Sequence, residues 1–151
     1  MDTLPTIAHP AFLVSVEVLD DRGLRILLEE RSGLGPEQDD PLGLGFKEQG
    51  IVAKATDATY EICWPVVVCF AVRGDPFPKG PPSISTISEE SCDSAFLQWV
   101  KSKSHASADY VAAMAGEDEA DRKLRHWAVS SNEAHFDVAA LGPPLVARLP
   151  S

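Results

Sequence analysis

The sequence contains no long hydrophobic run and no recognisable export signal. No stretch approaches the roughly 18 to 20 consecutive apolar residues that a membrane-spanning helix needs, so we expect no membrane protein. No basic segment precedes the first apolar run, which argues against secretion and predicts a cytoplasmic protein. At 151 residues, with 44% hydrophobic and 24% charged side chains, the chain is expected to fold as one soluble domain spanning residues 1–151.

Cysteine is also scarce, which limits the sulfur chemistry that the chain can carry. The residues Cys63, Cys69 and Cys92 are odd in number and form no C-x-x-C pair. Cys63 and Cys69 lie in the most apolar part of the chain, where a free cysteine behaves as a small hydrophobic residue. We therefore predict reduced thiols, with neither a disulfide framework nor a zinc site.

Motifs that hold nucleotides or metals are missing as well. The sequence has no G-x-G-x-x-G, no G-x-x-x-x-G-K-[ST], no H-E-x-x-H and no G-x-S-x-G. These patterns bind phosphates at a helix N-terminus, hold zinc, or expose a nucleophilic serine. No cofactor and no metal site are predicted, and the sequence favours a binding protein over an enzyme.

Basic residues are few relative to acidic ones. Twenty-three Asp and Glu against thirteen Lys and Arg give a net charge of −10, which repels phosphate backbones and attracts basic surfaces. We therefore predict a basic protein partner and no direct contact with nucleic acid. The candidate contacts are clustered acids: Glu37, Asp39, Asp40, Glu117, Asp118, Glu119 and Asp121.

The first acidic cluster lies in a segment rich in glycine and proline. Residues 32–45 hold four glycines and two prolines around Glu37, Asp39 and Asp40, a composition that predicts an exposed acidic loop without regular structure. The spacing of these acids does not match the calcium-binding loop of an EF-hand. Apolar residues in and beside this loop suggest a homo-oligomer as a further alternative, and the oligomeric state stays open.

Alternating and continuous apolar patterns predict strands in the first half of the chain. Residues 12–18 alternate, with Phe12, Val14, Val16 and Val18 on one buried face, and a turn at 20–23 leads to 24–30 at hairpin distance. A helix is the alternative for 24–30. Residues 60–72 predict two strands, or one bent strand, at the centre of the sheet, and the run 66–72 predicts burial on both faces.

A helix and a second hairpin follow. Ser94 is a candidate N-cap for a helix over 95–103 that buries Phe96, Trp99 and Val100, and a second short helix is expected near 108–115. Residues 124–130 and 135–140 predict a hairpin around residues 132–133. Its register places Val129 opposite Phe136 and Trp127 opposite Val138, so that one face is apolar. Residues 145–149 predict a final edge strand.

The opposite face of this second hairpin carries the only constellation that suggests chemistry. The register places His126, His135 and Asp137 close together, where a carboxylate can orient a histidine as a general base. A solvated polar face is the structural alternative, and no nucleophile can be assigned from the pattern. Catalysis or small-ligand binding by these three residues is therefore the second hypothesis, after partner binding.

These patterns together predict an α+β protein, with a mostly antiparallel sheet of about six strands packed by one or two helices. Several segments carry a resemblance to known proteins: Tyr60-Glu61-Ile62, Val72-Arg73, Ser94 to Leu97, Leu124 to Trp127, Phe136-Asp137-Val138 and Pro143-Pro144. They cover roughly the C-terminal ninety residues. The chain thereby resembles small uncharacterised bacterial proteins, some of which look like immunity proteins that neutralise toxins. This resemblance implies a shared fold and a protein partner, and no residue role is carried over.

Overall fold

The computed structural model describes Leu4, Ile7 and residues 10–38, 48–52, 57–74, 85–104 and 123–150. Within these ranges the chain forms ten strands and one helix. The elements are β1 (Ala11–Val18), β2 (Leu24–Glu30), β3 (Gly33–Gln38), β4 (Glu48–Val52), β5 (Thr59–Trp64), β6 (Val67–Gly74), β7 (Thr86–Glu89), α1 (Ala95–Lys103), β8 (Leu124–Ser130), β9 (Ala134–Leu141) and β10 (Leu145–Leu149).

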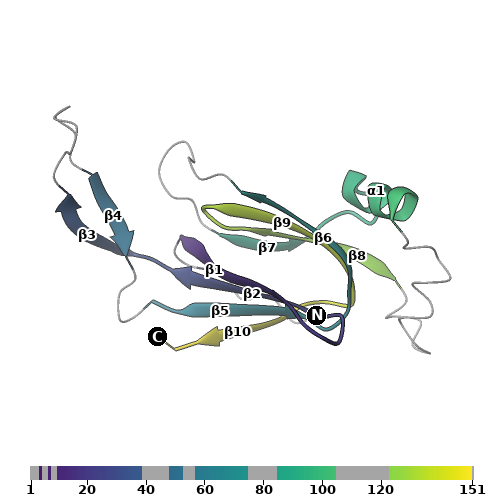
Figure 1. Cartoon of the computed structure of the whole chain (residues 1–151), viewed down its shortest axis with the longest axis horizontal. Coiled ribbons are helices and arrows are strands. Elements are labelled where there is room, and N and C mark those ends of the chain that lie inside the picture. Colours follow the sequence, from purple (N-terminus) through teal and green to yellow (C-terminus); the bar gives the residue numbers. More distant parts are fainter. Residues whose placement is uncertain are drawn as a thin grey trace.

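Two four-stranded antiparallel sheets lie one above the other (Figure 1). The first sheet has the order β1-β2-β5-β10 and the second has the order β6-β9-β8-β7. A separate two-stranded ribbon, β3–β4, projects from one end of the first sheet. The mainly antiparallel α+β class is confirmed, but the expected single sheet of about six strands is wrong. The helix expected near 108–115 lies outside the described residues, and the single-domain assignment stays a prediction.

The main hydrophobic core fills the space between the two sheets. Successive side chains of a strand point to opposite faces, so every second residue of each inner strand enters this space. The buried apolar residues that meet there come from β2, β5, β8 and β9: Leu24, Ile26, Leu28, Tyr60, Ile62, Trp64, Trp127, Val129, Phe136 and Val138. The sandwich is therefore held together chiefly by its inner strands.

The second predicted hairpin is confirmed in position and in register. Val129 lies opposite Phe136, and Trp127 lies opposite Val138. The turn is closed by Ser131, whose backbone N–H donates to the Ala134 carbonyl oxygen at 2.9 Å. The apolar face of this hairpin enters the core, and its polar face looks away from the first sheet.

The first predicted hairpin is also present, but its buried face is wrong. A β-bulge shifts the register between Leu13 and Ser15. Phe12 consequently lies on the outer face, opposite Glu29, whereas Val16 lies opposite the buried Ile26 on the inner face. Because β1 is the edge of the first sheet, its valines remain exposed despite the alternating pattern.

The apolar segment 60–72 forms two strands that belong to different sheets. Pro65 lies at the corner between β5 and β6, where its missing N–H removes no ladder hydrogen bond. β5 is an inner strand of the first sheet, as expected for a central strand. β6 is an edge strand, so the predicted burial of residues 66–72 on both faces is wrong: Val72 is exposed and Cys69 is half-buried.

The helix α1 begins where it was predicted and covers one end of the second sheet. The Ser94 hydroxyl oxygen accepts the Leu97 backbone N–H at 3.2 Å and caps the helix N-terminus. Leu97 and Val100 are buried against Leu124, Ala139 and Leu141 of the sheet. The predicted burial of Trp99 is wrong, because the helix is rotated so that this side chain points to solvent.

The predicted loop over residues 32–45 is wrong for its first half. β3 occupies Gly33–Gln38 and pairs with β4 in a ribbon whose register shifts between Leu34 and Glu37. Pro36 falls within this irregular stretch, where a residue without a backbone N–H is tolerated. Residues 39–45 lie outside the described part of the chain.

A buried carboxyl group lies at the C-terminal end of β2 in the first sheet. Glu30 is almost fully buried and accepts hydrogen bonds from the Tyr60 hydroxyl at 2.8 Å and from the Ala58 backbone N–H at 3.3 Å. Burial, and then the hydrogen bond to Glu30, raise the pKa of Tyr60 above its ordinary value of 10.0. The folded protein therefore holds the phenol proton more tightly than the unfolded chain does.

This raised pKa makes a prediction about alkaline stability. Between the two pKa values the folded state binds more protons, so its stability falls as pH rises above about 10. Tyr60→Phe removes this titration but costs the hydrogen bond to Glu30 at neutral pH. In urea unfolding, we expect the stability gap between wild type and Tyr60→Phe to shrink from pH 8 to pH 11. A gap that stays constant over this interval would contradict the prediction.

Candidate functional site

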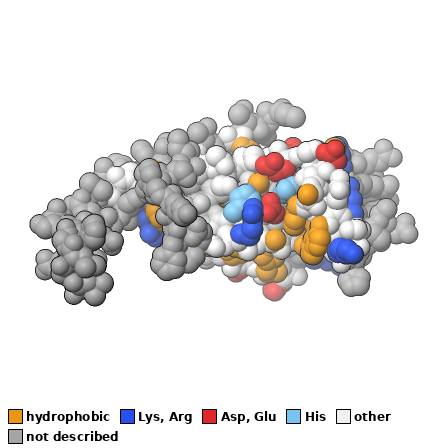
Figure 2. All heavy atoms as spheres, turned by 90° about the horizontal axis from the view of Figure 1, so that it is seen from above, with side chains coloured by type: hydrophobic (Ala, Val, Ile, Leu, Met, Phe, Trp, Pro, Cys, Tyr) orange, Lys and Arg blue, Asp and Glu red, His pale blue; other side chains and the backbone are white. Residues whose placement is uncertain are grey.

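The candidate site lies on the outer face of the second sheet, beside α1. Among the described residues, α1 covers one end of this face, and the polar side chains beyond it are exposed to different degrees. Ser130, His135 and Arg73 lie side by side on three neighbouring strands, and Asp137 lies one step further along β9. Figure 2 looks onto this face and shows histidine, arginine and acidic side chains gathered there.

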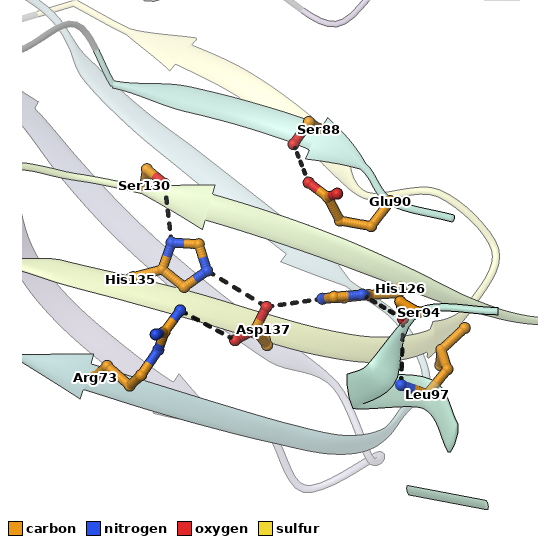
Figure 3. A network of polar contacts seen from close by, with 9 residues as sticks. All are labelled: Arg73, Ser88, Glu90, Ser94, Leu97, His126, Ser130, His135 and Asp137. Carbon is orange, nitrogen blue, oxygen red and sulfur yellow. Dashed lines mark hydrogen bonds and ion pairs between the residues drawn. The ribbon is translucent and has the colours of Figure 1, made fainter. Parts of the chain in front are cut away.

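The structure brings the three predicted residues into direct contact. Asp137 Oδ1 lies 2.7 Å from His126 Nε2 and 3.3 Å from His135 Nε2 (Figure 3). The side chain of His126 is only 7% exposed, whereas those of Asp137 and His135 are 19% and 32% exposed. The contact predicted from the hairpin register is therefore present, in a partly covered setting.

Two serines complete this network, one on each histidine. The Ser130 hydroxyl lies 2.9 Å from His135 Nδ1, and the Ser94 hydroxyl lies 2.8 Å from His126 Nδ1. A carboxylate only accepts hydrogen bonds, so each Nε2 that faces Asp137 carries a hydrogen. In the neutral ring each Nδ1 is then an acceptor, and both serine hydroxyls donate to the histidines. Each ring nitrogen in this arrangement has a partner.

The surroundings of the network supply a positive charge and an aromatic contact. The guanidinium of Arg73 lies 3.8 Å from Asp137 Oδ2, and its side chain is 73% exposed. The ring of Phe96 lies 4.9 Å from that of His126 and shields the buried histidine. Asp137 is thus the common partner of two imidazoles and one guanidinium, while Arg73 keeps donors directed to solvent.

A shallow cleft opens next to the exposed half of the network. It has a volume of about 310 Å³ and is lined by residues of β6, of β8, of β9 and of the β8–β9 turn: Arg73, Gly74, Ser130, Ser131, Asn132, Glu133, Ala134 and His135. This volume is at the lower end of the range for small-ligand sites. His126 and Asp137 do not line it, so only His135 of the predicted trio faces the cleft.

The arrangement suits proton transfer better than metal binding. Among the described residues, no group of three or more His, Cys, Asp and Glu side chains is placed to hold a metal ion. A hydroxyl, an imidazole and a carboxylate in hydrogen-bonded sequence can move a proton from the hydroxyl to the ring. The described network therefore has the parts of a general-base device.

The predicted partner-binding acids fall almost wholly outside the described structure. Glu37 lies in β3, opposite Gln49 of β4. The others lie outside the described residues: Asp39, Asp40, Glu117, Asp118, Glu119 and Asp121. Their role in binding stays a prediction.

Sequence reasoning missed Arg73, Ser94 and Ser130 as members of the site. Ser130 could have been predicted, because a register that pairs Val129 with Phe136 also pairs Ser130 with His135. Arg73 and Ser94 come from β6 and from the cap of α1, whose pairing with the hairpin no local pattern indicates.

Two further properties bear on function. All three cysteines are free, and burial raises the pKa of both the Cys63 and the Cys69 thiol, which favours their protonated form at neutral pH. No helix within the described ranges is long and apolar enough to cross a membrane.

Comparisons of the chain with protein-family models, curated proteins and solved structures found no match, so the functional proposal rests on the residues of the chain itself.

Proposed function

We propose that this protein acts by binding a basic protein partner in the cytoplasm, in the manner of a bacterial immunity protein that neutralises a toxin. The observation that carries the proposal is the open edge of β1. Val14, Val16 and Val18 are 51%, 36% and 66% exposed on a strand that, among the described residues, forms a ladder only with β2; on its other side only its first residue, Ala11, is bonded, to Ser85 and Asn132. An uncovered edge strand with apolar side chains is a ready template for an added strand from another chain.

The acidic residues around this edge favour a partner with basic residues. The Glu17 side chain is 56% exposed, and the exposed Asp20 and Asp21 follow β1 in the turn. Arg25 contacts both Glu17 at 3.2 Å and Glu61 at 2.7 Å, so its positive charge is offset by two carboxylates. An extended segment with basic residues complements such an edge and is drawn to it at low salt.

The net charge of the chain also argues against a second copy as the occupant. Two copies of β1 placed edge to edge bring two acidic surfaces together, in a protein with a net charge of −10. Like charges on neighbouring strands oppose such pairing. The predicted acids, of which Glu37 lies in β3, contribute to the same negative net charge.

The proposal is tested by capturing proteins from the native host lysate with matched edge variants. We expect a basic protein to be retained by the wild type at low salt, released at high salt, and lost with the double variant Val16→Lys, Val18→Lys. Val72→Lys places one such lysine on an exposed valine of the other sheet and should retain the partner, whereas Val18→Lys alone, with the same change in charge, should weaken its retention. The proposal fails if the edge variant and the Val72 variant retain the same proteins equally.

A second capture separates the edge from the predicted acidic cluster. Replacing Glu37, Asp39 and Asp40 by their amides lowers the negative charge without touching β1. If these acids contact the partner, the salt concentration that releases it should fall. An unchanged release point would remove these residues from the proposed interface.

A further inference from the structure

Ser130, His135 and Asp137 are hydrogen-bonded in the order that nucleophilic catalysis requires. Its hydroxyl lies 2.9 Å from His135 Nδ1, and the other ring nitrogen of His135 lies 3.3 Å from Asp137 Oδ1. A hydroxyl, a base within hydrogen-bond reach and a carboxylate that orients the base are the parts of an activated serine. Figure 3 shows the three side chains in this sequence along the outer face of the sheet.

The hydroxyl also faces space that a substrate can occupy. Ser130, His135 and Arg73 all line the 310 Å³ cleft. Arg73 lies opposite His135 in the strand register, and its exposed guanidinium has donors to spare for a developing negative charge. Glu133 in the wall of the cleft disfavours ligands that carry several negative charges. The cleft therefore fits a small, uncharged acyl compound.

We propose that Ser130 is a nucleophile that is acylated by small uncharged carboxylic esters. The Ser130 oxygen attacks the ester carbon while its proton passes to His135 Nδ1, and Arg73 faces the resulting oxyanion. The intermediate collapses with cleavage of the bond to the alkoxide, which leaves as an alcohol with the proton from His135. Water, deprotonated by His135, then releases the carboxylic acid and restores Ser130.

The other members of the network position the base rather than touch the substrate. Asp137 holds the ring of His135 with Nε2–H directed at the carboxylate, which leaves Nδ1 free to accept the serine proton. His126 and Ser94 fix Asp137 from the side of α1. This site lies on the second sheet and the β1 edge on the first, so the two proposals stand or fall independently.

The test is covalent labelling of the whole chain with a fluorophosphonate, followed by mass spectrometry of its peptides. The expected result is one adduct on Ser130 with loss of fluoride, absent from Ser130→Ala. The matched control is Ser88→Ala, because Ser88 lies on β7 of the same sheet, outside the lining of the cleft, and its hydroxyl bonds to Glu90 instead of a histidine. This variant should label like the wild type.

A kinetic measurement gives a second, independent readout. Hydrolysis of p-nitrophenyl acetate should fall by about a hundredfold or more in His135→Gln, as expected for loss of a general base. Circular dichroism and urea unfolding verify that each variant is folded. Equal labelling of Ser130 and Ser88, no adduct on Ser130 of the folded wild type, or hydrolysis unaffected by His135→Gln would each overturn the proposal.

Discussion

Phe136→Ala is expected to lower the free energy of unfolding by about 3 to 5 kcal/mol, the range for removing a fully buried aromatic side chain. Phe136 is fully buried on β9, an inner strand of the second sheet, and packs in the core between the sheets. Typical domains are stable by only about 5 to 15 kcal/mol, so this loss is a large part of the total. Urea unfolding monitored by circular dichroism measures it directly.

The matched control for this variant lies directly across the strand pair. Val72 of β6 is the register partner of Phe136 on the same face of the sheet, but it is 45% exposed. Because the edge strand leaves this side chain in contact with water, Val72→Ala should cost about 0.5 kcal/mol, as is usual for surface positions. A similar cost for both variants would mean that the first sheet does not cover the second as described.

The hairpin that contains Phe136 is the part of the fold that the sequence pattern predicted best. The pairing of Trp127 with Val138 and of Val129 with Phe136 was predicted, because a tight turn fixes the register of the two strands that it joins. The same register predicted the contacts of His126 and His135 with Asp137. Local pairing and alternation therefore suffice for a hairpin and for a site on one of its faces.

The strand β1 was predicted correctly, but the face on which its alternating residues lie and their burial were not. A β-bulge near Val14 separates Phe12 from Val16, and no residue in the segment marks its position. Burial also depends on which strand forms the edge of a sheet, a property of the whole topology that a local pattern does not contain. The same reason explains why the apolar segment that became β6 was expected to be buried on both faces.

The β3–β4 ribbon shows a different limit. Glycine and proline usually mark loops, and the four glycines and two prolines of residues 32–45 led to that prediction for the whole segment. A ribbon tolerates them where its register is irregular, because the residues there make no regular ladder bonds. Composition indicated the irregularity but not the strands on both sides of it.

The extent of the candidate site could not be predicted for a related reason. Ser94 reaches His126 across 32 residues of sequence, from the N-terminus of a helix that packs on the sheet. Arg73 reaches Asp137 from β6, the other neighbour of β9. Long-range contacts of this kind require the strand order, which periodicity alone does not supply.

Asp137→Ala is expected to lower the free energy of unfolding by about 1 to 3 kcal/mol, because a buried hydrogen-bond donor is left without its partner. The buried Nε2–H of His126 loses its acceptor, and the guanidinium of Arg73 loses its counter-charge. Glu29→Ala is the matched control: it removes another strand carboxylate with an ion pair, to Arg31, but both side chains are about one-third exposed. Its cost should stay at about 0.5 kcal/mol.

A double-variant cycle assigns the cost of Asp137→Ala to the buried hydrogen bond. His126→Phe keeps a ring against Phe96 but has no N–H to satisfy, so in this background the loss of Asp137 should be smaller by about 1 to 2 kcal/mol. Additive costs would mean that Asp137 does not stabilise the fold through His126. In that case the hydrogen bond that matters would be the one from Asp137 to His135. The rate of fluorophosphonate labelling of Ser130 in Asp137→Ala would then measure how much Asp137 contributes by positioning His135.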